Sequence, residues 1–221
     1  AGSGDLLQGC LDVGARPAIL AGIEIDPDAY ELGRQRLSDA IFLQRDAFLA
    51  ETILELPQLA WDLVIGNPPF VRYQDGAHAS ESLPSALAVR QALCETLEVI
   101  PNGTPAQRSL LSHAASRYSG LADLALPACL LSMALVRPGG RLALVLPQSW
   151  LSRDYAQPLR GCLDELFDVE TILEDEGATW FPDALVRTSL VVAVRRGGKV
   201  ARARHPQHQL LSPKSADEMS L

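Results

Sequence analysis

The chain has 221 residues, which is enough for one ordinary domain with a sizeable hydrophobic core. Hydrophobic residues make up 48% and charged residues 21%, as in a water-soluble globular protein, and neither a signal peptide nor a run of about 18 apolar residues is present. The formal net charge of −8 excludes a protein that coats nucleic acid along its whole length. We therefore expect a cytoplasmic protein that is neither secreted nor inserted in a membrane.

Strand-like and helix-like segments alternate in the first third of the chain. The stretch AILAGIEI is typical of a buried strand, and Asp26 followed by Pro27 predicts the start of a capped helix. The predicted helices here are 5–13, 28–37 and 47–56, and the predicted strands are 18–25, 41–44 and 61–65.

The middle of the chain differs in composition. Residues 71–120 are polar, contain three prolines and have helix-like patterns near 84–99 and 106–117. We expect this segment to be a polar insertion or a flexible lobe within the domain.

Alternation returns in the last third. The predicted elements are a helix at 121–136 that the sequence RPGG stops, a strand at 141–146, a helix at 151–166, and strands at 169–173 and 188–194. The short connection between the last two strands suits an antiparallel hairpin. We expect one domain over 1–196 and a basic tail or linker over 197–221.

Basic residues gather near the end of the chain. The segment 185–216 has no acidic residue and seven basic ones, namely Arg187, Arg195, Arg196, Lys199, Arg202, Arg204 and Lys214. The segment is either a solvated tail or a local strip that faces phosphate groups.

Continuous apolar strands that alternate with helices predict an α/β fold, with a mostly parallel sheet covered on both faces. Ligands of such sheets bind at the carboxyl ends of the strands. The polar residues considered next all lie at such ends.

A glycine turn opens the sequence. Gly2 and Gly4 flank Ser3 directly before a helical pattern, and Glu24 lies twenty residues beyond Gly4 at a strand end. This is where a carboxylate that binds ribose hydroxyls is expected. Because the third glycine of a dinucleotide turn is absent, the pattern favours a nucleoside cofactor without phosphates. Taken alone, the glycine turn could equally be an artificial linker.

Two further strand ends carry polar residues. Asp46 could accept a hydrogen bond from an adenine amine, with Phe48 or Leu49 packed on the ring, or it could simply cap the next helix. Asn67 then precedes two prolines and Phe70. The prolines make the loop stiff, so that the Asn67 amide oxygen and the Pro68 carbonyl form a pair of acceptors for an NH₂ group.

In motif order, the sequence resembles the N6-adenine DNA methyltransferases of the γ arrangement found in restriction–modification systems. The resemblance rests on AGSG, GIEIDPDA, NPPF, and WFPDALVRTSLVVAV near the end. It implies a Rossmann-like class I methyltransferase fold with a seven-stranded sheet and an antiparallel terminal hairpin. The counterpart of the family's first strand is missing before residue 1, as is the expected target-recognition part.

The resemblance also implies S-adenosylmethionine as the cofactor and no metal. The implied cofactor-binding residues are Ala1, Gly2, Ser3, Gly4, Glu24, Ile25, Asp46, Ala47, Phe48 and Asn67, and the implied catalytic residues are Asn67, Pro68, Pro69 and Phe70. The implied contacts to the flipped target base or DNA are Phe70, Phe181, Trp180, Arg72 and Tyr73, although Trp180 could instead be a core residue.

The implied activity is methyl transfer to the N6 amine of a flipped adenine. Hydrogen bonds to Asn67 and the Pro68 carbonyl would localise the lone pair of the amine nitrogen, which then attacks the methyl group. Double-stranded DNA and a restriction or specificity subunit are the expected partners.

Three alternatives stay open. A protein glutamine or an RNA base also offers a planar NH₂ group that Asn-Pro-Pro could hold. A non-catalytic subunit could keep the fold and bind DNA. A dehydrogenase fits least, because the phosphate-binding glycine turn is incomplete.

Overall fold

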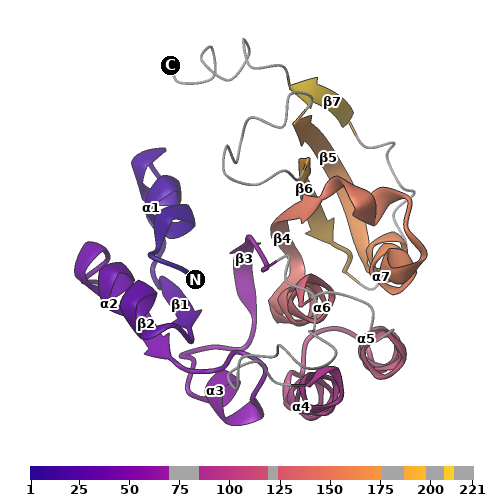
Figure 1. The fold of residues 1–221 in the computed structure, drawn as a ribbon, viewed down its shortest axis with the longest axis horizontal. Helices are drawn as coiled ribbons and strands as arrows, with labels where there is room; N and C mark the ends of the chain where they lie inside the picture. The colour runs from indigo at the N-terminus through magenta and orange to yellow at the C-terminus, as the bar shows by residue number, and fades with distance from the viewer. Residues whose placement is uncertain (70–84, 119–123, 176–186, 198–206, 212–221) are drawn as a thin grey trace, which may run out of the picture.

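In the computed structural model, the described residues are 1–69, 85–118, 124–175, 187–197 and 207–211, and their strands form two sheets (Figure 1). One sheet has two strands and the other has five, in the order β3-β4-β6-β5-β7. Within these ranges, no ladder hydrogen bonds join the two sheets. The predicted α/β class is confirmed, but the single seven-stranded sheet is not.

The two-stranded sheet is built by the first 44 residues. Strands β1 (Ala21–Glu24) and β2 (Ile41–Gln44) run parallel, so that their carboxyl ends meet. Helix α1 (Asp5–Asp12) precedes β1, and α2 (Pro27–Arg36) connects the two strands. Helix α2 begins as predicted, because Asp26 accepts a hydrogen bond of 2.8 Å from Ala29 N.

Phe42 of β2 packs where glycines leave room for its ring. An added Cβ on Gly33 would lie 2.7 Å from Phe42 Cε1, and one on Gly22 would lie 3.1 Å from Phe42 Cζ. Carbon atoms in contact prefer about 3.5–4.0 Å, so either side chain would displace the ring. The close approach of α2 to the two strands therefore depends on these glycines.

The five-stranded sheet is mixed. Strand β4 (Val136–Pro147) runs parallel to β3 (Trp61–Gly66) and antiparallel to β6 (Thr188–Arg195). Strand β5 (Phe167–Asp175) forms the predicted antiparallel pair with β6. Strands β3, β4 and β5 end at one edge of this sheet, where β6 begins.

Several element boundaries differ from the prediction, most of all the starts of β4 and α7. Helix α6 (Ala125–Leu135) ends before RPGG as expected, but β4 already includes that tetrapeptide. The helix predicted over 151–166 begins only at residue 157, as α7 (Gln157–Leu166), because two short 3-10 turns, η1 (Gln148–Leu151) and η2 (Asp154–Ala156), come first.

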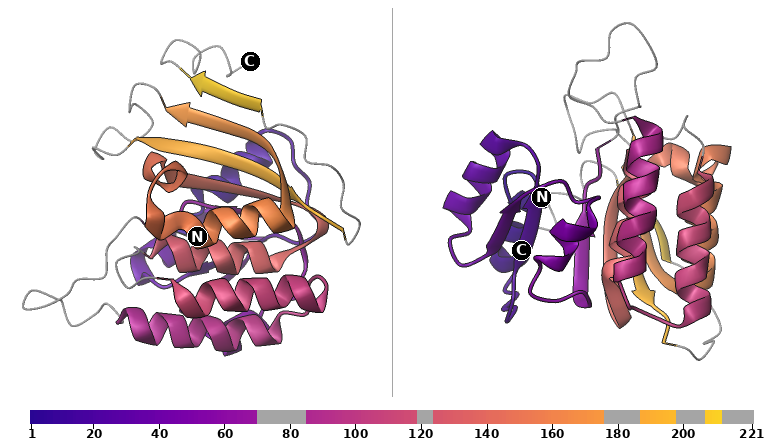
Figure 2. Two further views of the ribbon diagram at one scale, coloured as in Figure 1. Left: turned by 90° about the vertical axis from the view of Figure 1, so that its right-hand side faces the viewer. Right: turned by 90° about the horizontal axis from the view of Figure 1, so that it is seen from below.

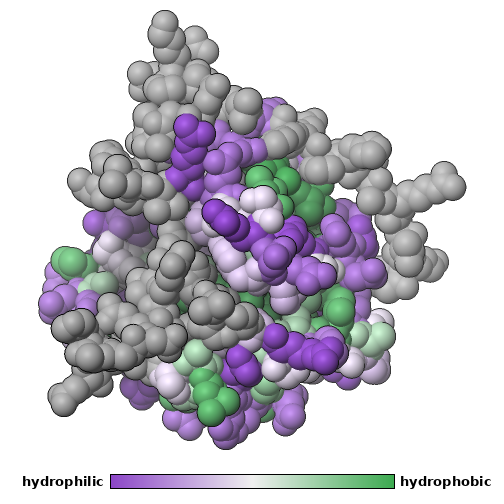
Figure 3. All heavy atoms as spheres, turned by 45° about the vertical axis from the view of Figure 1, so that its right-hand side comes forward, coloured by the Kyte–Doolittle hydropathy of each residue, from purple (hydrophilic) through white to green (hydrophobic). Residues whose placement is uncertain are grey.

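Helices α4 (Ala86–Val99), α5 (Pro105–Arg117), α6 and α7 lie side by side over one face of the five-stranded sheet (Figure 2). The short α3 (Ala50–Leu54) leads into β3. On the face shown in Figure 3, hydrophilic side chains dominate the described surface, and apolar ones form small separate groups.

The segment 71–120, which we expected to be a polar insertion or a flexible lobe, contributes to the main core in its described part. Both predicted helices form, as α4 and α5, but they belong to the main core. Val89, Leu93 and Leu97 recur every four residues on α4, and all three are buried. This spacing places them on one helix face, and the polar residues between them hid that stripe.

The expected tail at 197–221 also contributes to the sheet. Strand β7 (Gln207–Leu211) pairs in parallel with β5, from Thr171 opposite Gln207 to Asp175 opposite Leu211. Of the remaining residues, 198–206 and 212–221 lie outside the described ranges.

A buried arginine joins α6 to the sheet. The side chain of Arg195 is fully buried at the end of β6, and it donates hydrogen bonds to the carbonyls of Met133, Ala134, Val136 and Asn102. Burial lowers the pKa of Arg195 to about 10, so the side chain stays charged at neutral pH. It satisfies carbonyls at the end of α6 that have no helical partner.

The four cysteines are free thiols, and Cys129 and Cys162 are buried. Burial raises the pKa of Cys162 to about 12. Among the described residues, no helix has the length and apolar character needed to cross a bilayer.

Gly33→Ala is expected to destabilise the fold by about 1–3 kcal/mol, because the new methyl group overpacks against Phe42. The matched control is Gly161→Ala in α7, where an added Cβ meets no atom within 4 Å. The control is expected to stabilise the fold by about 0.5–1 kcal/mol through helix propensity. Urea unfolding measures both, and equal effects would contradict the packing role of Gly33.

Arg195→Met is expected to lower the free energy of unfolding by about 2–3 kcal/mol, because four carbonyls lose a charged donor. Arg141→Met, which removes an exposed ion pair to Glu170, is the control and should change it little. Thermal and denaturant unfolding of both variants test this. An Arg195→Met variant as stable as the parent would refute the stabilising role of the Arg195 hydrogen bonds.

Candidate cofactor and catalytic site

The loop over residues 1–4 is shaped by two glycines with positive φ. Gly2 has φ 57° and Gly4, the N-cap of α1, has φ 81°. An added Cβ on Gly4 would lie 2.9 Å from Leu37 Cδ1, whereas one on Gly2 would meet no atom within 4 Å. Gly4 therefore packs against the protein, while Gly2 borders open space that a ligand could occupy.

Ser3 helps to hold this loop in place. Its hydroxyl donates to the Asp5 carboxylate, which also forms an ion pair with Arg36. Arg36 in turn donates to the Ser3 carbonyl. The Ser3 hydroxyl is thus turned toward the start of α1.

The Glu24 carboxylate connects the loop to β1 and α2. Oε2 accepts from Gly2 N at 2.6 Å and from the Ala1 amino group at 3.0 Å, and Oε1 accepts from Asp26 N at 2.9 Å. A carboxylate has about four lone-pair sites, so Oε1 can accept one more hydrogen bond.

Two opposing effects set the pKa of Glu24. Burial raises it, but hydrogen bonds from Asp26 N, the Ala1 amino group and Gly2 N together lower it by more. The pKa of Glu24 therefore lies below its ordinary value, and the group is a carboxylate at neutral pH.

Asp46 lies next to Glu24 because β1 and β2 are parallel. Arg45 N donates to Glu24 O at 3.0 Å, and Asp46 follows directly. Asp46 Oδ1 accepts from Phe48 N at 2.9 Å, and Oδ2 has no hydrogen-bond partner among the described residues. The N-cap of α3 is Leu49, so Asp46 shapes its own loop and does not cap that helix.

Apolar side chains near these carboxylates differ in exposure. Ile25 is 64% and Leu49 37% exposed. Phe48 and Ala47, in contrast, pack partly against the main hydrophobic core. Ile25 and Leu49 therefore offer the freer apolar surfaces beside Glu24 and Asp46.

Asn67 follows the last residue of β3. It is exposed, Pro68 is buried and Pro69 is exposed. The buried proline anchors the loop, while the Asn67 amide remains accessible. The other predicted residues here, Phe70, Arg72, Tyr73, Trp180 and Phe181, lie outside the described residues.

Hydrogen bonds bring together Ala1, Gly2, Glu24 and the Asp46 loop. Helix α1 of the same unit contacts β3, and Asn67 directly follows β3. Among the described residues, no hydrogen bond joins Asn67 to this group. Sequence reasoning missed Thr96 of α4, a buried residue whose hydroxyl donates to Phe48 O at 2.6 Å. A threonine within a helix gives no sequence signal for such a contact.

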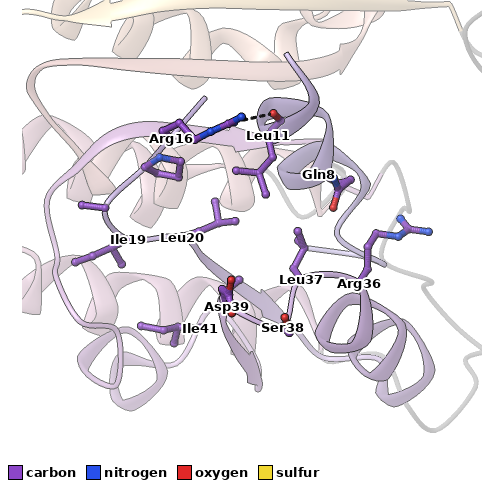
Figure 4. A pocket seen from close by; sticks show the side chains of 13 residues that line it. Gln8, Leu11, Arg16, Ile19, Leu20, Arg36, Leu37, Ser38, Asp39 and Ile41 are labelled. Carbon is purple, nitrogen blue, oxygen red and sulfur yellow. Dashed lines mark hydrogen bonds between the residues drawn. The ribbon is translucent and has the colours of Figure 1, made fainter. Parts of the chain in front are cut away.

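A cavity of the described part of the chain lies elsewhere. It has a volume of about 440 Å³ and lies between residues 16–20 and 37–41, just before β1 and β2 begin (Figure 4). It is therefore at the amino ends of these strands, away from Glu24 and Asp46. Arg16 at its rim donates to Leu11 O. No group of three or more metal-binding side chains occurs among the described residues.

Comparisons with known proteins identify relatives. The model of the Eco57I restriction-modification methylase family matches residues 39–176. The type II methyltransferase M.PaeR7I of Pseudomonas aeruginosa is 25% identical over 149 residues, covering 66% of this chain and 21% of that protein. A tRNA1(Val) (adenine(37)-N6)-methyltransferase of Porphyromonas gingivalis is 26% identical over 195 residues, covering 79% of this chain and 64% of that protein. The chain thus spans less than two thirds of either relative.

Solved structures share the fold. A Listeria monocytogenes protein assigned to the class I S-adenosylmethionine-dependent methyltransferases superposes with a TM-score of 0.64 at 16% identity, over 99% of this chain and 59% of that one. A type I restriction-modification methyltransferase subunit of Streptococcus thermophilus superposes with a TM-score of 0.64 at 17% identity. The match covers 91% of this chain and 39% of that one.

The class I methyltransferase fold that the sequence motifs implied is therefore confirmed. The family match begins just before β2 and includes the Asp46 loop, Asn67 and β4. Because it covers more than half of the 221 residues, the chain belongs to the Eco57I restriction-modification methylase family.

Proposed function

We propose that the protein containing this chain transfers a methyl group from S-adenosylmethionine to the N6 amine of a flipped adenine in DNA, within a restriction–modification system. The observation that carries this proposal is the placement of Asn67-Pro68-Pro69 at the end of β3, in a methylase family whose fold also brings Glu24 and Asp46 together.

The described residues suit an adenosyl cofactor. Glu24 Oε1 can accept from a ribose hydroxyl, while Oε2 stays bound to the loop. Asp46 Oδ2 can accept from the adenine amine, and Ile25 offers an apolar surface for the ring. Gly2 borders space for the remainder of the cofactor. Ala1, Ser3, Gly4, Ala47 and Phe48 support this site through the backbone and packing.

Asn67 and Pro68 would hold the target amine. S-adenosylmethionine supplies a methyl group on a positively charged sulfur. In-line attack by the amine nitrogen would break the carbon–sulfur bond and leave a neutral thioether, and the methylated nitrogen would then lose one proton to solvent. The Asn67 oxygen accepts from one N–H of the amine and the Pro68 carbonyl from the other. Both contacts draw the nitrogen lone pair out of the ring and stabilise the positive charge that develops on nitrogen. The burial of Pro68 supports this role, because a fixed loop would hold both acceptors in place before the substrate arrives.

The target base has to leave the duplex, which costs a few kcal/mol. Stacking on Phe70 and Phe181, with Trp180 beside it, would offset that cost, and Arg72 and Tyr73 would contact DNA. A specificity or restriction subunit is the partner that we propose. The proposal is supported by the similar fold of a protein whose structure describes complex assembly in a type I restriction-modification system.

A second candidate substrate is an adenine in RNA. The tRNA1(Val) relative matches a larger share of this chain than M.PaeR7I does, at similar identity. The amine chemistry at Asn67 would be the same. Labelled-methyl incorporation into purified duplex DNA against tRNA separates the two, and transfer to tRNA alone would refute the DNA assignment.

Asn67→Ala is expected to lower the rate of methyl transfer by at least about 100-fold, because one transition-state hydrogen bond is lost. Cofactor affinity should change far less. Gln35→Ala, an exposed amide on α2 bonded to Glu31, is the control and should keep the parent rate. Single-turnover kinetics with labelled cofactor measure this, and an Asn67→Ala enzyme at the parent rate would refute the catalytic role.

Glu24→Gln is expected to weaken cofactor binding roughly tenfold, the loss of one hydrogen bond to a charged group. Glu31→Gln on α2 is the control. In the parent, the lowered pKa of Glu24 predicts that affinity is constant around neutral pH and is lost only as the pH falls below the ordinary glutamate pKa of 4.5. The stabilisation from ionised Glu24 is likewise present above that pKa and is lost as pH falls. Calorimetric titration of the cofactor across pH measures the affinity of the variant and the pH dependence of the parent. A loss of parent affinity near neutral pH would contradict the role of Glu24 as the ribose-binding carboxylate.

A further inference from the structure

Two arginine side chains differ from every other arginine in the described part of the chain. Arg153 and Arg187 are exposed, and neither guanidinium has a hydrogen-bond or carboxylate partner there. Arginines in ion pairs with carboxylates are Arg34, Arg36, Arg45, Arg137, Arg141 and Arg196. Arginines with other hydrogen bonds are Arg16, Arg90, Arg108, Arg117, Arg160 and Arg195.

Both free arginines lie at the edge of the sheet where the proposed catalytic loop lies. Arg187 directly precedes β6, whose first residue pairs with Pro147 at the end of β4. Arg153 follows η1, the turn that continues from β4. Since β4 runs parallel to β3, these positions and Asn67 share one edge.

The backbone that carries the two arginines is firmly held. Gln148 N donates to Arg187 O at 2.8 Å, and Arg153 N donates to Ser149 O at 2.9 Å. Arg160 also donates to Arg153 O at 2.9 Å. The backbones of both loops are thus fixed, while neither guanidinium group has a partner among the residues that the structure describes.

The neighbouring side chains strengthen this frame. Trp150 Nε1 donates to Ser189 Oγ at 2.8 Å, which ties η1 to β6. The buried Glu174 accepts from the Gln148 side chain. Within the described ranges, the exposed Asp154 follows Arg153 directly in sequence, and the two side chains form no ion pair.

We propose that Arg153 and Arg187 contact phosphates of the DNA backbone beside the target adenine. An arginine without an internal partner loses no ion pair when it binds phosphate, and its planar group suits phosphate oxygens. In a chain of net charge −8, such a local pair supplies the positive field that DNA needs. This assignment rests on the proposed DNA methyltransferase function.

The test is the salt dependence of DNA binding by the double variant Arg153→Gln/Arg187→Gln. The charge-matched control is Arg34→Gln/Arg141→Gln, which removes two exposed arginines that are paired with Glu31 and Glu170. Fluorescence anisotropy with an adenine-containing duplex gives the slope of log Kd against log salt concentration. The slope is expected to fall by about one per phosphate contact in the test variant and to stay unchanged in the control.

Kinetics add a second measurement. The KM for DNA is expected to rise in the test variant, while kcat at saturating DNA and the cofactor affinity stay at parent values. An unchanged slope and KM would overturn the phosphate contacts and leave the proposed function standing. An equal fall of the salt-dependence slope in the control variant would also overturn the proposed phosphate contacts, because the change in net charge alone would then explain the effect. A parent protein that binds tRNA and no duplex DNA would overturn both proposals.

Discussion

The carboxylate of Glu24 is the contact on which the cofactor site depends. It accepts hydrogen bonds from the opening loop through Gly2 N and from the start of α2 through Asp26 N. Hydrogen bonds to a charged acceptor are stronger than those between neutral groups, so this one side chain holds both backbone segments next to β1. The same carboxylate keeps capacity for a further donor at Oε1.

The helices that cover the five-stranded sheet also support the cofactor site. Helix α4 contributes Val89, Leu93 and Leu97 to the main core, and its Thr96 holds the backbone of the loop that carries Asp46. Arg195 then joins the end of α6 to the sheet. Residues far from any ligand thus determine where the strand ends lie, as is usual for sites built on loops over a rigid scaffold.

Local signals explain what could be predicted from sequence. The cap at Asp26, the apolar strands and the β5–β6 hairpin depend on neighbouring residues, and all are present. The role of α4 and α5 in the core was missed because polar residues between the buried positions dominate the composition. Strand β7 was missed because its pairing with β5 depends on a distant partner. The roles of Thr96 and Arg195 likewise depend on carbonyls 48 and about 60 residues away. For the site, the order of Glu24, Asp46 and Asn67 along the chain was enough to place each at a strand end, but not to give their hydrogen bonds.

The bond from Thr96 to Phe48 O has a consequence for ligand binding. Thr96 lies on the helix that comes after Asn67-Pro68-Pro69 in the chain, and Phe48 lies in the loop that follows the cofactor strands. The loop that carries Asp46 is therefore held by a helix of the main core, so a change at Thr96 would reach the cofactor site without altering any side chain that would touch the cofactor.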